Sequence, residues 1–265
     1  MDNCKILIAT HKEAEMPKFN IYEPIMVGAY NKENIIYTPD NIGDNISNKN
    51  PMYCELTALY YGWKNIECEY LGLVHYRRLL MYKKKSKDKL SNVLNDTEAE
   101  MLVSQYKILV PKKRKYYIET IYSHYKHTFH KEHLDETKNI IEKLYPEYLK
   151  VFNKTMKKSS AYMFNMMVLK KELLNDYCEW LFNILNKLEE KFKNINYDDF
   201  DMRYCGRVGE ILFNVWLNKK LEDKIISKND ICELKWFYIG KVSKIKKIKS
   251  FLMAKFFNKK YKGSF

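Results

Sequence analysis

The chain is poor in the residues that make flexible connections. It contains 8 glycines and 6 prolines among 265 residues, so long Gly-rich or Pro-rich linkers are not expected. Its six cysteines are scattered and form no Cys-x-x-Cys pair. We therefore predict free, buried cysteines in a protein of a reducing compartment.

Long apolar runs are also missing. No stretch reaches about 18 consecutive apolar residues, which argues against a transmembrane helix. The first residues, Met1-Asp2-Asn3, lead directly into a predicted strand, so we expect no signal peptide. Hydrophobic residues make up 46% of the chain, which predicts a folded globular protein. At this length, one domain with appendages or two small domains are both possible.

The positive charge is concentrated at one end. Residues 241–265 contain nine lysines and no acidic residue, so they account for +9 of the formal net charge of +14. Residues 1–240 are left with only +5, and the charge of this region does not indicate a nucleic-acid partner. We predict an α/β domain over residues 1–240 and a separate basic tail over residues 241–265.

Strands and helices alternate in the first half of the chain, which is typical of an α/β sheet. We predict strands over 4–10, 23–29, 69–75, 106–110, 161–169 (interrupted by Asn165) and 231–240. We predict helices over 51–65, 96–104, 170–192 and 204–220, and a mainly helical region over 116–156.

The apolar run 70–74 ends in His75-Tyr76-Arg77-Arg78. Open α/β sheets bind ligands at the carboxyl ends of their strands, and Arg suits bidentate recognition of phosphate. We therefore predict a diphosphate-binding site here, with an ordinary basic surface turn as the alternative. Adjacent residues of a continuing strand point to opposite faces, so the sequence does not decide which arginine faces the ligand.

Two further segments have side chains suited to contact a nucleotide or a sugar. Thr10-His11-Lys12 ends the first predicted strand and is expected to contact the nucleotide, unless it is an ordinary polar turn. The polar loop 43–47 and the predicted helix start at 50–55 have side chains suited to a ribose or a sugar. Helix capping would also explain Asn50. From these two segments we predict nucleotide or sugar binding by Thr10, His11, Lys12, Asp44, Asn45, Asn50, Tyr53 and Glu55.

Four histidines recur at every third position, at residues 124, 127, 130 and 133. Each step of three rotates back by about 60° on a helix, so the four side chains cannot share one metal ion. A pair could, but no third ligand is obvious, and we predict no metal site. We expect His130 and Asn165 to line the acceptor side.

A polar cluster near residue 200 contains Asp199, Asp201 and Glu210 together with Arg203 and Arg207. Arg207 and Glu210 are spaced i,i+3 on a predicted helix, and such a pair is most often a plain helix salt bridge. Alternatively, one carboxylate acts as the general base for an acceptor hydroxyl. Asp199, Asp201 and Glu210 are therefore the candidate catalytic residues.

The basic tail places apolar side chains among its lysines, a pattern typical of an amphipathic helix that lies on anionic lipid. A solvated, partly disordered C-terminus is the alternative. The apolar positions are Ile245, Ile248, Phe251, Leu252, Phe256 and Phe257.

Four segments in this order resemble a bacterial glycosyltransferase family long classed as a domain of unknown function, whose members occur in capsular and exopolysaccharide gene clusters. They are ATHK (9–12), GDNISNKN (43–50), YCELTALY (53–60) and GLVHYRR (72–78). The resemblance covers about residues 4–220, and RVGEILFNVWL (207–217) also matches in character.

The resemblance implies a GT-A-like fold, a Rossmann-type mixed sheet flanked by helices. It also implies hexosyl transfer, including galactosyl or galactofuranosyl transfer, from a UDP-sugar to a lipid-linked polysaccharide precursor. The usual Asp-x-Asp metal motif of this fold is replaced by His75-Tyr76-Arg77. This departure implies that His and Arg neutralise the diphosphate and puts a divalent metal cofactor in doubt.

We therefore predict a cytoplasmic glycosyltransferase that is peripheral on the inner face of the cell membrane. Its expected partners are a UDP-sugar donor, a lipid-linked saccharide acceptor and an anionic membrane surface, without nucleic acid. A non-catalytic lipid- or polyanion-binding module and a zinc-dependent hydrolase are the alternatives. An inverting transferase requires a catalytic base and a retaining one does not, and the sequence leaves this open.

Overall fold

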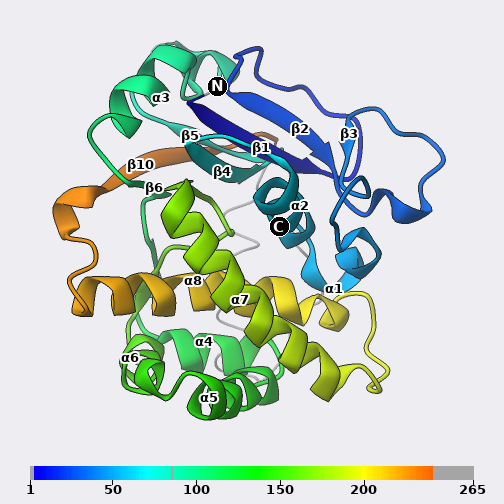
Figure 1. The fold of residues 1–265 in the computed structure, drawn as a ribbon, viewed down its shortest axis with the longest axis vertical. Coiled ribbons are helices and arrows are strands. Elements are labelled where there is room, and N and C mark those ends of the chain that lie inside the picture. Colours follow the sequence, from blue (N-terminus) through cyan, green and yellow to red (C-terminus); the bar gives the residue numbers. More distant parts are fainter. Residues whose placement is uncertain (1–2, 85, 241–265) are drawn as a thin grey trace.

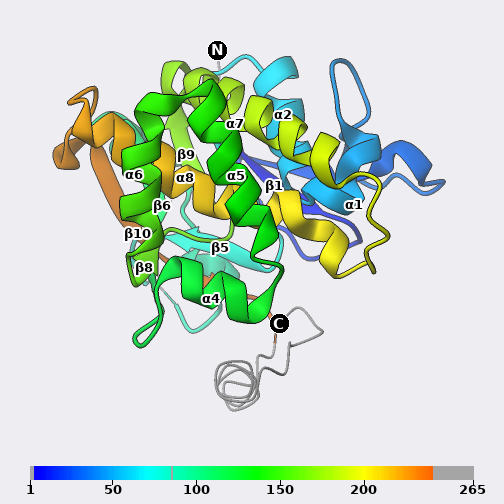
Figure 2. The same cartoon turned by 90° about the horizontal axis from the view of Figure 1, so that it is seen from below.

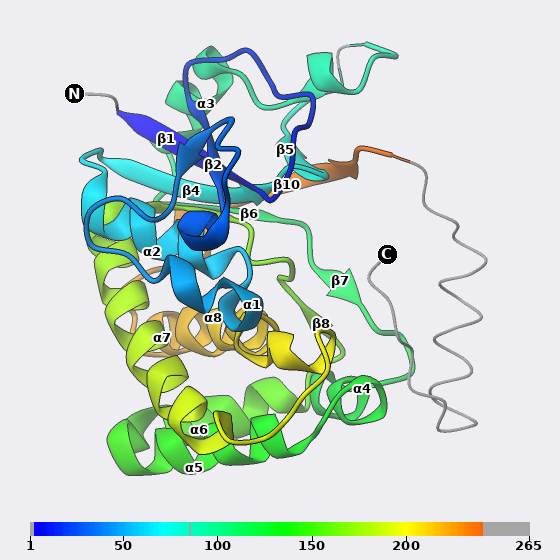
Figure 3. The same ribbon diagram turned by 90° about the vertical axis from the view of Figure 1, so that its right-hand side faces the viewer.

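The structure of the chain is a computed structural model that describes residues 3–84 and 86–240. A mixed sheet is covered on one face by α3 (Asp96–Val103) and on the other by several helices (Figures 1 and 3). The predicted basic helix over 241–265 lies outside the described residues. The mixed α/β architecture predicted from the sequence is confirmed.

Within the described residues the main sheet has eight strands in the order β3-β2-β1-β4-β5-β10-β6-β9. Strand β1 runs parallel to both β2 and β4, whereas β5 and β9 run antiparallel to their neighbours in the sheet. The strands are β1 (Cys4–Thr10), β2 (Tyr22–Met26), β3 (Thr38–Pro39), β4 (Tyr70–His75), β5 (Arg78–Met81), β6 (Ile108–Pro111), β9 (Met167–Lys170) and β10 (Ile231–Tyr238). Two short strands, β7 (Arg114–Lys115) and β8 (Ser160–Ala161), form a separate antiparallel pair.

Strand β1 shows why the sheet is covered on both faces. Successive side chains of a strand point to opposite faces, and from Ile6 to Ala9 of β1 both sets are apolar and buried. Ile6 and Ile8 pack in a core cluster that includes residues of α3, and Leu7 and Ala9 pack in the larger cluster on the other face.

Strand β4 belongs to a closed ring of pairings. It pairs with β9 through residues 70–73 and with β5 through His75 and Arg78. Strand β5 pairs with β10, β10 with β6, and β6 with β9, which closes the ring. The predicted motif 75–78 is therefore a tight turn between two strands of this ring.

The helices on the larger side of the sheet form two layers (Figures 1 and 2). The inner helices α2, α7 and α8 supply many of the buried residues of the larger core cluster, and α5 and α6 pack against α7 and α8. The helices other than α3 are α1 (Asn50–Tyr53), α2 (Leu56–Asn65), α4 (Ile121–Thr128), α5 (Glu132–Leu144), α6 (Pro146–Met156), α7 (Lys171–Phe192) and α8 (Tyr204–Glu222).

Two of the predicted elements differ clearly in extent from those observed. The single helix predicted over 51–65 is broken at Cys54, whose φ is +53°, and the side chain of Asn50 donates to the Cys54 carbonyl at 2.8 Å. The strand predicted over 161–169 is reduced to β9 in the main sheet. The interruption predicted at Asn165 is confirmed, since Phe164 and Asn165 have φ of +77° and +49°.

Candidate functional site

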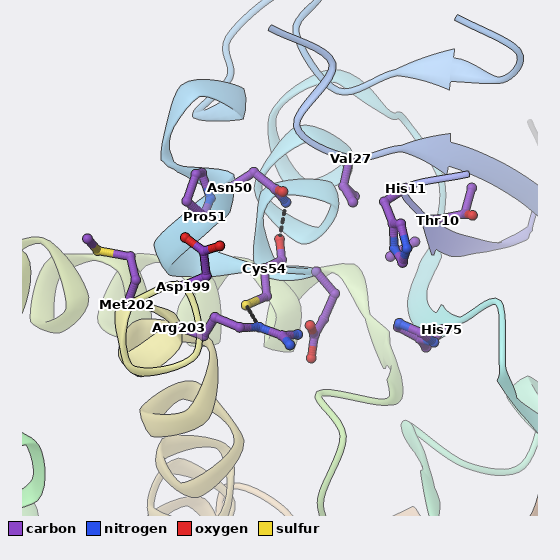
Figure 4. Close-up of a pocket in the computed structure, with 12 residues that line it drawn as sticks. Thr10, His11, Val27, Asn50, Pro51, Cys54, His75, Asp199, Met202 and Arg203 are labelled. Atoms are coloured by element: carbon purple, nitrogen blue, oxygen red, sulfur yellow. Dashed lines mark hydrogen bonds between the residues drawn. The ribbon is translucent and has the colours of Figure 1, made fainter. Parts of the chain in front are cut away.

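A pocket of about 340 Å³ opens at the carboxyl ends of β1 and β4 (Figure 4), and its size is in the range of small-molecule sites. Six predicted site residues line it: Thr10, His11, Asn50, Glu55, His75 and Asp199. Six residues not predicted to be in the site complete the lining: Ala9, Val27, Pro51, Cys54, Met202 and Arg203. The pocket therefore joins segments that are up to about 190 residues apart.

The register of two parallel strands brings the first two motifs together. Ala9 of β1 lies beside His75 of β4, and the backbone N–H of Tyr76 donates to the Ala9 carbonyl at 3.2 Å. The rings of His11 and Tyr76 then meet edge to face, with centroids 5.4 Å apart. Both motifs thus stand at the same edge of the sheet.

A buried carboxylate, Asp40, fixes the loop that leads to α1. It is fully buried and accepts hydrogen bonds from the backbone N–H groups of Gly28 and Ala29, at 2.9 and 3.0 Å, and from the Ser47 hydroxyl at 2.5 Å. Gly28 has φ of +63°, and a Cβ there would lie 2.7 Å from the Asn50 side chain. The network therefore holds the turn after β2 against the start of α1, where Asn50 lines the pocket.

His75 is held as a neutral hydrogen-bond donor. The backbone N–H of Arg77 donates to its Nδ1 at 3.2 Å, so the ring proton is left on Nε2. Burial, followed by the nearby charges of Arg78 and Arg77, lowers the pKa of His75 to about 3. The site thus has an imidazole N–H donor here without the positive charge that the sequence-based interpretation gave it.

The two arginines after His75 lie beside the pocket, outside its lining. The Arg77 guanidinium lies 5.0 Å from the Tyr76 ring centre, and the Arg78 guanidinium lies 4.6 Å from that of Phe164. Burial and then the charges of Lys32 and Arg77 lower the pKa of His11. Both arginines therefore raise the potential at the pocket edge that His11 and His75 form.

Arg203 is the cation that lines the pocket itself. It is the last residue of the short 3-10 helix η4 (Asp201–Arg203) and directly precedes α8. Its Nε donates to Cys54 Sγ at 3.1 Å (Figure 4). Burial raises the pKa of the Cys54 thiol to about 11, so the partner of Arg203 is a neutral thiol and not a competing anion. The charges of Glu55 and Glu210 also act on Arg203, which therefore stands as a cation beside a carboxylate that lines the same pocket.

Glu55 and Asn165 form a second polar group at the pocket. The buried Asn165 side chain donates to Glu55 at 2.9 Å and to the Gly206 carbonyl at 3.0 Å. Residues 164 and 165 both have positive φ, a conformation that costs free energy and that presents Asn165 to Glu55. Burial and then the charge of Glu55 raise the pKa of Glu210 to about 7.

Asp201, the third candidate base, has partners of its own. Its carboxylate accepts from His130 at 2.9 Å and lies 4.0 Å from Arg207. The structure therefore brings His130 and Asp201 together, and Asp201 lies two residues after Asp199 in the chain. Asp199 is the candidate base that lines the pocket.

The remaining histidines are used in structural contacts. Both His124 and His127 bind the buried carboxylate of Glu119 through Nδ1, at 2.9 and 2.5 Å, and His133 contacts the hydroxyl of Tyr197 at 2.9 Å. Burial alone would raise the pKa of Glu119, but the hydrogen bonds from the two histidines outweigh it and lower that pKa. In the part of the chain that the structure describes, no three His, Cys, Asp or Glu side chains are placed to hold a metal ion.

The other predicted donor residues lie away from the pocket lining. The Tyr53 hydroxyl is hydrogen-bonded to Glu189 at 2.9 Å, and Asp44 accepts from the Tyr60 hydroxyl at 3.1 Å. Asn45 donates to the carbonyl of Gly43, two residues before it. Lys12 lies at the rim, 6.0 Å from the Tyr76 ring centre.

Comparison with known proteins shows the family to which the chain belongs. The chain belongs to a family described as a domain of unknown function (DUF4422), whose profile matches residues 5–221. Its fold is similar to the apo structure of WbbM, a bifunctional glycosyltransferase, with a TM-score of 0.82 and 34% sequence identity. The alignment covers 91% of this chain and 46% of WbbM, so the chain spans less than half of that protein.

A comparison with curated proteins gave no match. No helix among residues 3–84 and 86–240 combines the length and the apolar character needed to cross a bilayer.

Proposed function

We propose that the chain is a glycosyltransferase that moves a hexosyl group, galactosyl or galactofuranosyl, from a UDP-sugar to a lipid-linked polysaccharide precursor in capsule or exopolysaccharide synthesis. The observation that carries the proposal is the pocket at the ends of β1 and β4. It combines an arginine and two imidazoles with two carboxylates. The similarity to the WbbM glycosyltransferase supports it.

The donor diphosphate lies against the cationic side of the pocket. Negative charge accumulates on the diphosphate as the bond to the sugar breaks, and preorganised donors stabilise that charge. Arg203 supplies a charge inside the pocket, Arg77 and Arg78 supply charge at its edge, and His75 donates from Nε2. Thr10 and His11 hold the nucleoside, and Asn50 and Glu55 position the sugar.

The catalytic base of an inverting transfer is Asp199. It lines the pocket, whereas Asp201 already binds His130 and Glu210 lies outside the lining. A base must be within hydrogen-bond reach of the acceptor hydroxyl, and this requirement favours Asp199. Asp199→Asn is expected to lower kcat by about 10²- to 10⁴-fold while UDP affinity stays unchanged. Full kcat in Asp199→Asn, or retention of the anomeric configuration in the product, would rule out this role.

Donor binding is tested by calorimetry with UDP. Arg203→Gln is expected to weaken UDP binding by roughly 10- to 100-fold, because a hydrogen bond to a charged group is lost. The exposed Arg114, changed to Gln, is the matched control and should bind UDP like the native chain. Absence of UDP binding by the native chain at millimolar concentration would favour a non-catalytic lipid- or polyanion-binding module instead.

The donor sugar and the metal requirement are tested together. A panel of UDP-sugars is incubated with the chain and a lipid-linked acceptor, with and without EDTA, and products are detected by mass. The described residues provide no metal-binding cluster, and we expect transfer to survive EDTA. Loss of activity with EDTA would overturn the metal-free mechanism.

We place the enzyme in the cytoplasm, on the inner face of the cell membrane, because its acceptor is attached to a lipid. The basic tail predicted from residues 241–265 would hold it there. Replacing Lys246, Lys247 and Lys249 by Gln should reduce binding to anionic vesicles and leave UDP binding intact.

A further inference from the structure

The small sheet of β7 and β8 lies apart from the main sheet, near α4 (Figure 3). We use the name β7–β8 ribbon for residues 112–118 together with residues 157–161. Arg114 pairs with Ala161 and Lys115 with Ser160, so the ribbon has its own ladder, separate from the main sheet. None of the sequence motifs or pocket residues belongs to it.

The ribbon is rich in exposed basic side chains, two of which contact neutral groups: Lys113 lies 4.7 Å from the Tyr162 ring centre, and Lys158 donates to Asn218 at 2.8 Å. Its exposed basic residues are Lys112, Lys113, Arg114, Lys115, Lys157 and Lys158. Among the described residues none of these six forms a salt bridge with a carboxylate. The pKa of Lys158 is lowered mainly by burial and secondarily by the charges of Lys113 and Lys154, so these two lysines lie close enough to act on it. The surface therefore attracts anions.

Two large, mainly apolar residues, Tyr117 and Ile118, follow shortly after β7, and we call this pair the tip of the ribbon. Tyr117 is 85% exposed and Ile118 is 55% exposed. Tyr117 has φ of +57°, a conformation that is unfavourable for a residue with a Cβ. The strained backbone at Tyr117 is not compensated by burial of its side chain. Such strain is often kept at functional sites, so we interpret the exposed Tyr117 as a contact residue.

The tip is held in place by the chain on both sides of it. The backbone N–H of Tyr116, a buried residue, donates to the Ser159 carbonyl at 2.8 Å, and the N–H of Ile118 donates to the Tyr116 carbonyl at 2.7 Å. After the tip, Glu119 is buried against two histidines. Tyr117 and Ile118 are thus presented by an ordered turn.

We propose that the β7–β8 ribbon docks on an anionic lipid bilayer. Tyr117 and Ile118 enter the headgroup region, where an aromatic side chain with a polar end is favoured, and the cations of the ribbon that share their side lie over acidic headgroups. This surface is distinct from the basic tail, and its membrane contact requires no glycosyl transfer. With the tail, it gives the enzyme two attachments to the membrane.

The positive charge of the ribbon argues against two other binding partners, the basic tail and a second copy of the chain. Residues 241–265 contain nine lysines and no acidic residue, so the tail is repelled by the ribbon. A second copy of the chain presents the same six cations and is repelled in the same way. An anionic bilayer complements both the charge and the apolar tip.

The proposal is tested with the full chain and sucrose-loaded vesicles of phosphatidylcholine, with or without phosphatidylserine. Tyr117→Ser/Ile118→Ser should lower partitioning onto the anionic vesicles by roughly tenfold. Lys112→Gln/Lys113→Gln/Lys115→Gln should lower it by roughly 100-fold, and added salt should lower the binding of the native chain.

Matched variants control for composition and charge. Tyr30→Ser/Ile36→Ser removes the same residue types from positions that are 63% and 47% exposed on another loop. Lys143→Gln/Lys187→Gln/Lys191→Gln removes the same charge from exposed positions on α5 and α7. Both controls should bind vesicles like the native chain, and thermal melts should confirm that all variants fold.

Equal losses in the ribbon variants and their controls would overturn the proposal. A loss in the lysine variant alone, with Tyr117→Ser/Ile118→Ser unchanged, would also overturn it. That result would indicate general attraction to a polyanion or an acidic protein without insertion of the tip.

Discussion

At the scale of single residues, His75 shows how a backbone hydrogen bond decides the chemistry of a side chain. We predict that His75 stays neutral from pH 5 to 8, with its proton on Nε2, because its pKa is lowered to about 3. Nitrogen–proton correlation spectra, assigned with His75→Gln, check this. Titration near pH 6.5 would show that the ring charges as an ordinary histidine does.

The depressed pKa of His75 has a defined effect on stability. Since the unfolded chain binds a proton near pH 6.5 and the native chain does not, the native state loses stability as the pH falls below about 6.5. The loss ends near pH 3, where the native ring is protonated as well.

Asn165 determines the position of the Glu55 carboxylate. We predict that Asn165→Ala lowers the free energy of unfolding by about 2–4 kcal/mol, because it removes a hydrogen bond to a charged group and places alanine at positive φ. Asn165→Gly loses the same hydrogen bonds without the backbone strain. Urea denaturation should find the glycine variant more stable than the alanine variant, and the reverse order would contradict the strain argument.

Sequence reasoning found six pocket residues because they follow recognisable strand and helix boundaries. Arg203 was noted in a polar cluster but was not assigned to the site. Its place in the pocket depends on the packing of the start of α8 against α1, about 150 residues earlier in the chain, and no local pattern encodes that contact. Cys54 was missed for a similar reason, since an isolated cysteine in an apolar run looks like an ordinary core residue.

At the scale of elements, the turn after β2 and the start of α1 act together. We predict that Gly28→Ala costs about 1–2 kcal/mol of stability and also weakens UDP binding, because its Cβ would displace the Asn50 side chain. Calorimetry and thermal melts measure the two effects.

Gly43→Ala is the control for that substitution. Gly43 has φ of +62°, and a Cβ there would meet Asn65, which does not line the pocket. It should lose comparable stability and bind UDP normally. Equal losses of UDP binding in both variants would show that the effect is general destabilisation.

Strands were easier to predict than the break within the helix predicted over 51–65. Strand β1 was predicted with its observed bounds and β4 within one residue, because continuous apolar runs mark strands that are buried on both faces. The break at Cys54 was missed because it is closed by the Asn50 side chain, a contact that propensity does not report. The residues 75–78 were predicted at a strand end, but their role as a turn into β5 depends on pairing with β10.

At the scale of the whole molecule, the ionisation of the Glu210 carboxylate links stability to pH. We predict that Glu210→Gln stabilises the chain at pH 8 by at most about 3 kcal/mol, because the pKa of Glu210 is raised to about 7. The native state holds this proton more tightly than the unfolded state, so stability falls as the pH rises from about 4.5 to 7. Urea denaturation at pH 5 and pH 8 measures the difference, and an advantage of equal size at both values would contradict it.

The position of β10 has a consequence for synthesis of the chain. Residues 231–238 pair with both β5 and β6, which were made more than 110 residues earlier. Until these residues leave the ribosome, both of those strands keep an open edge, and such edges pair readily with other chains. Nascent chains that end before residue 231 should therefore aggregate and should be strong clients of chaperones.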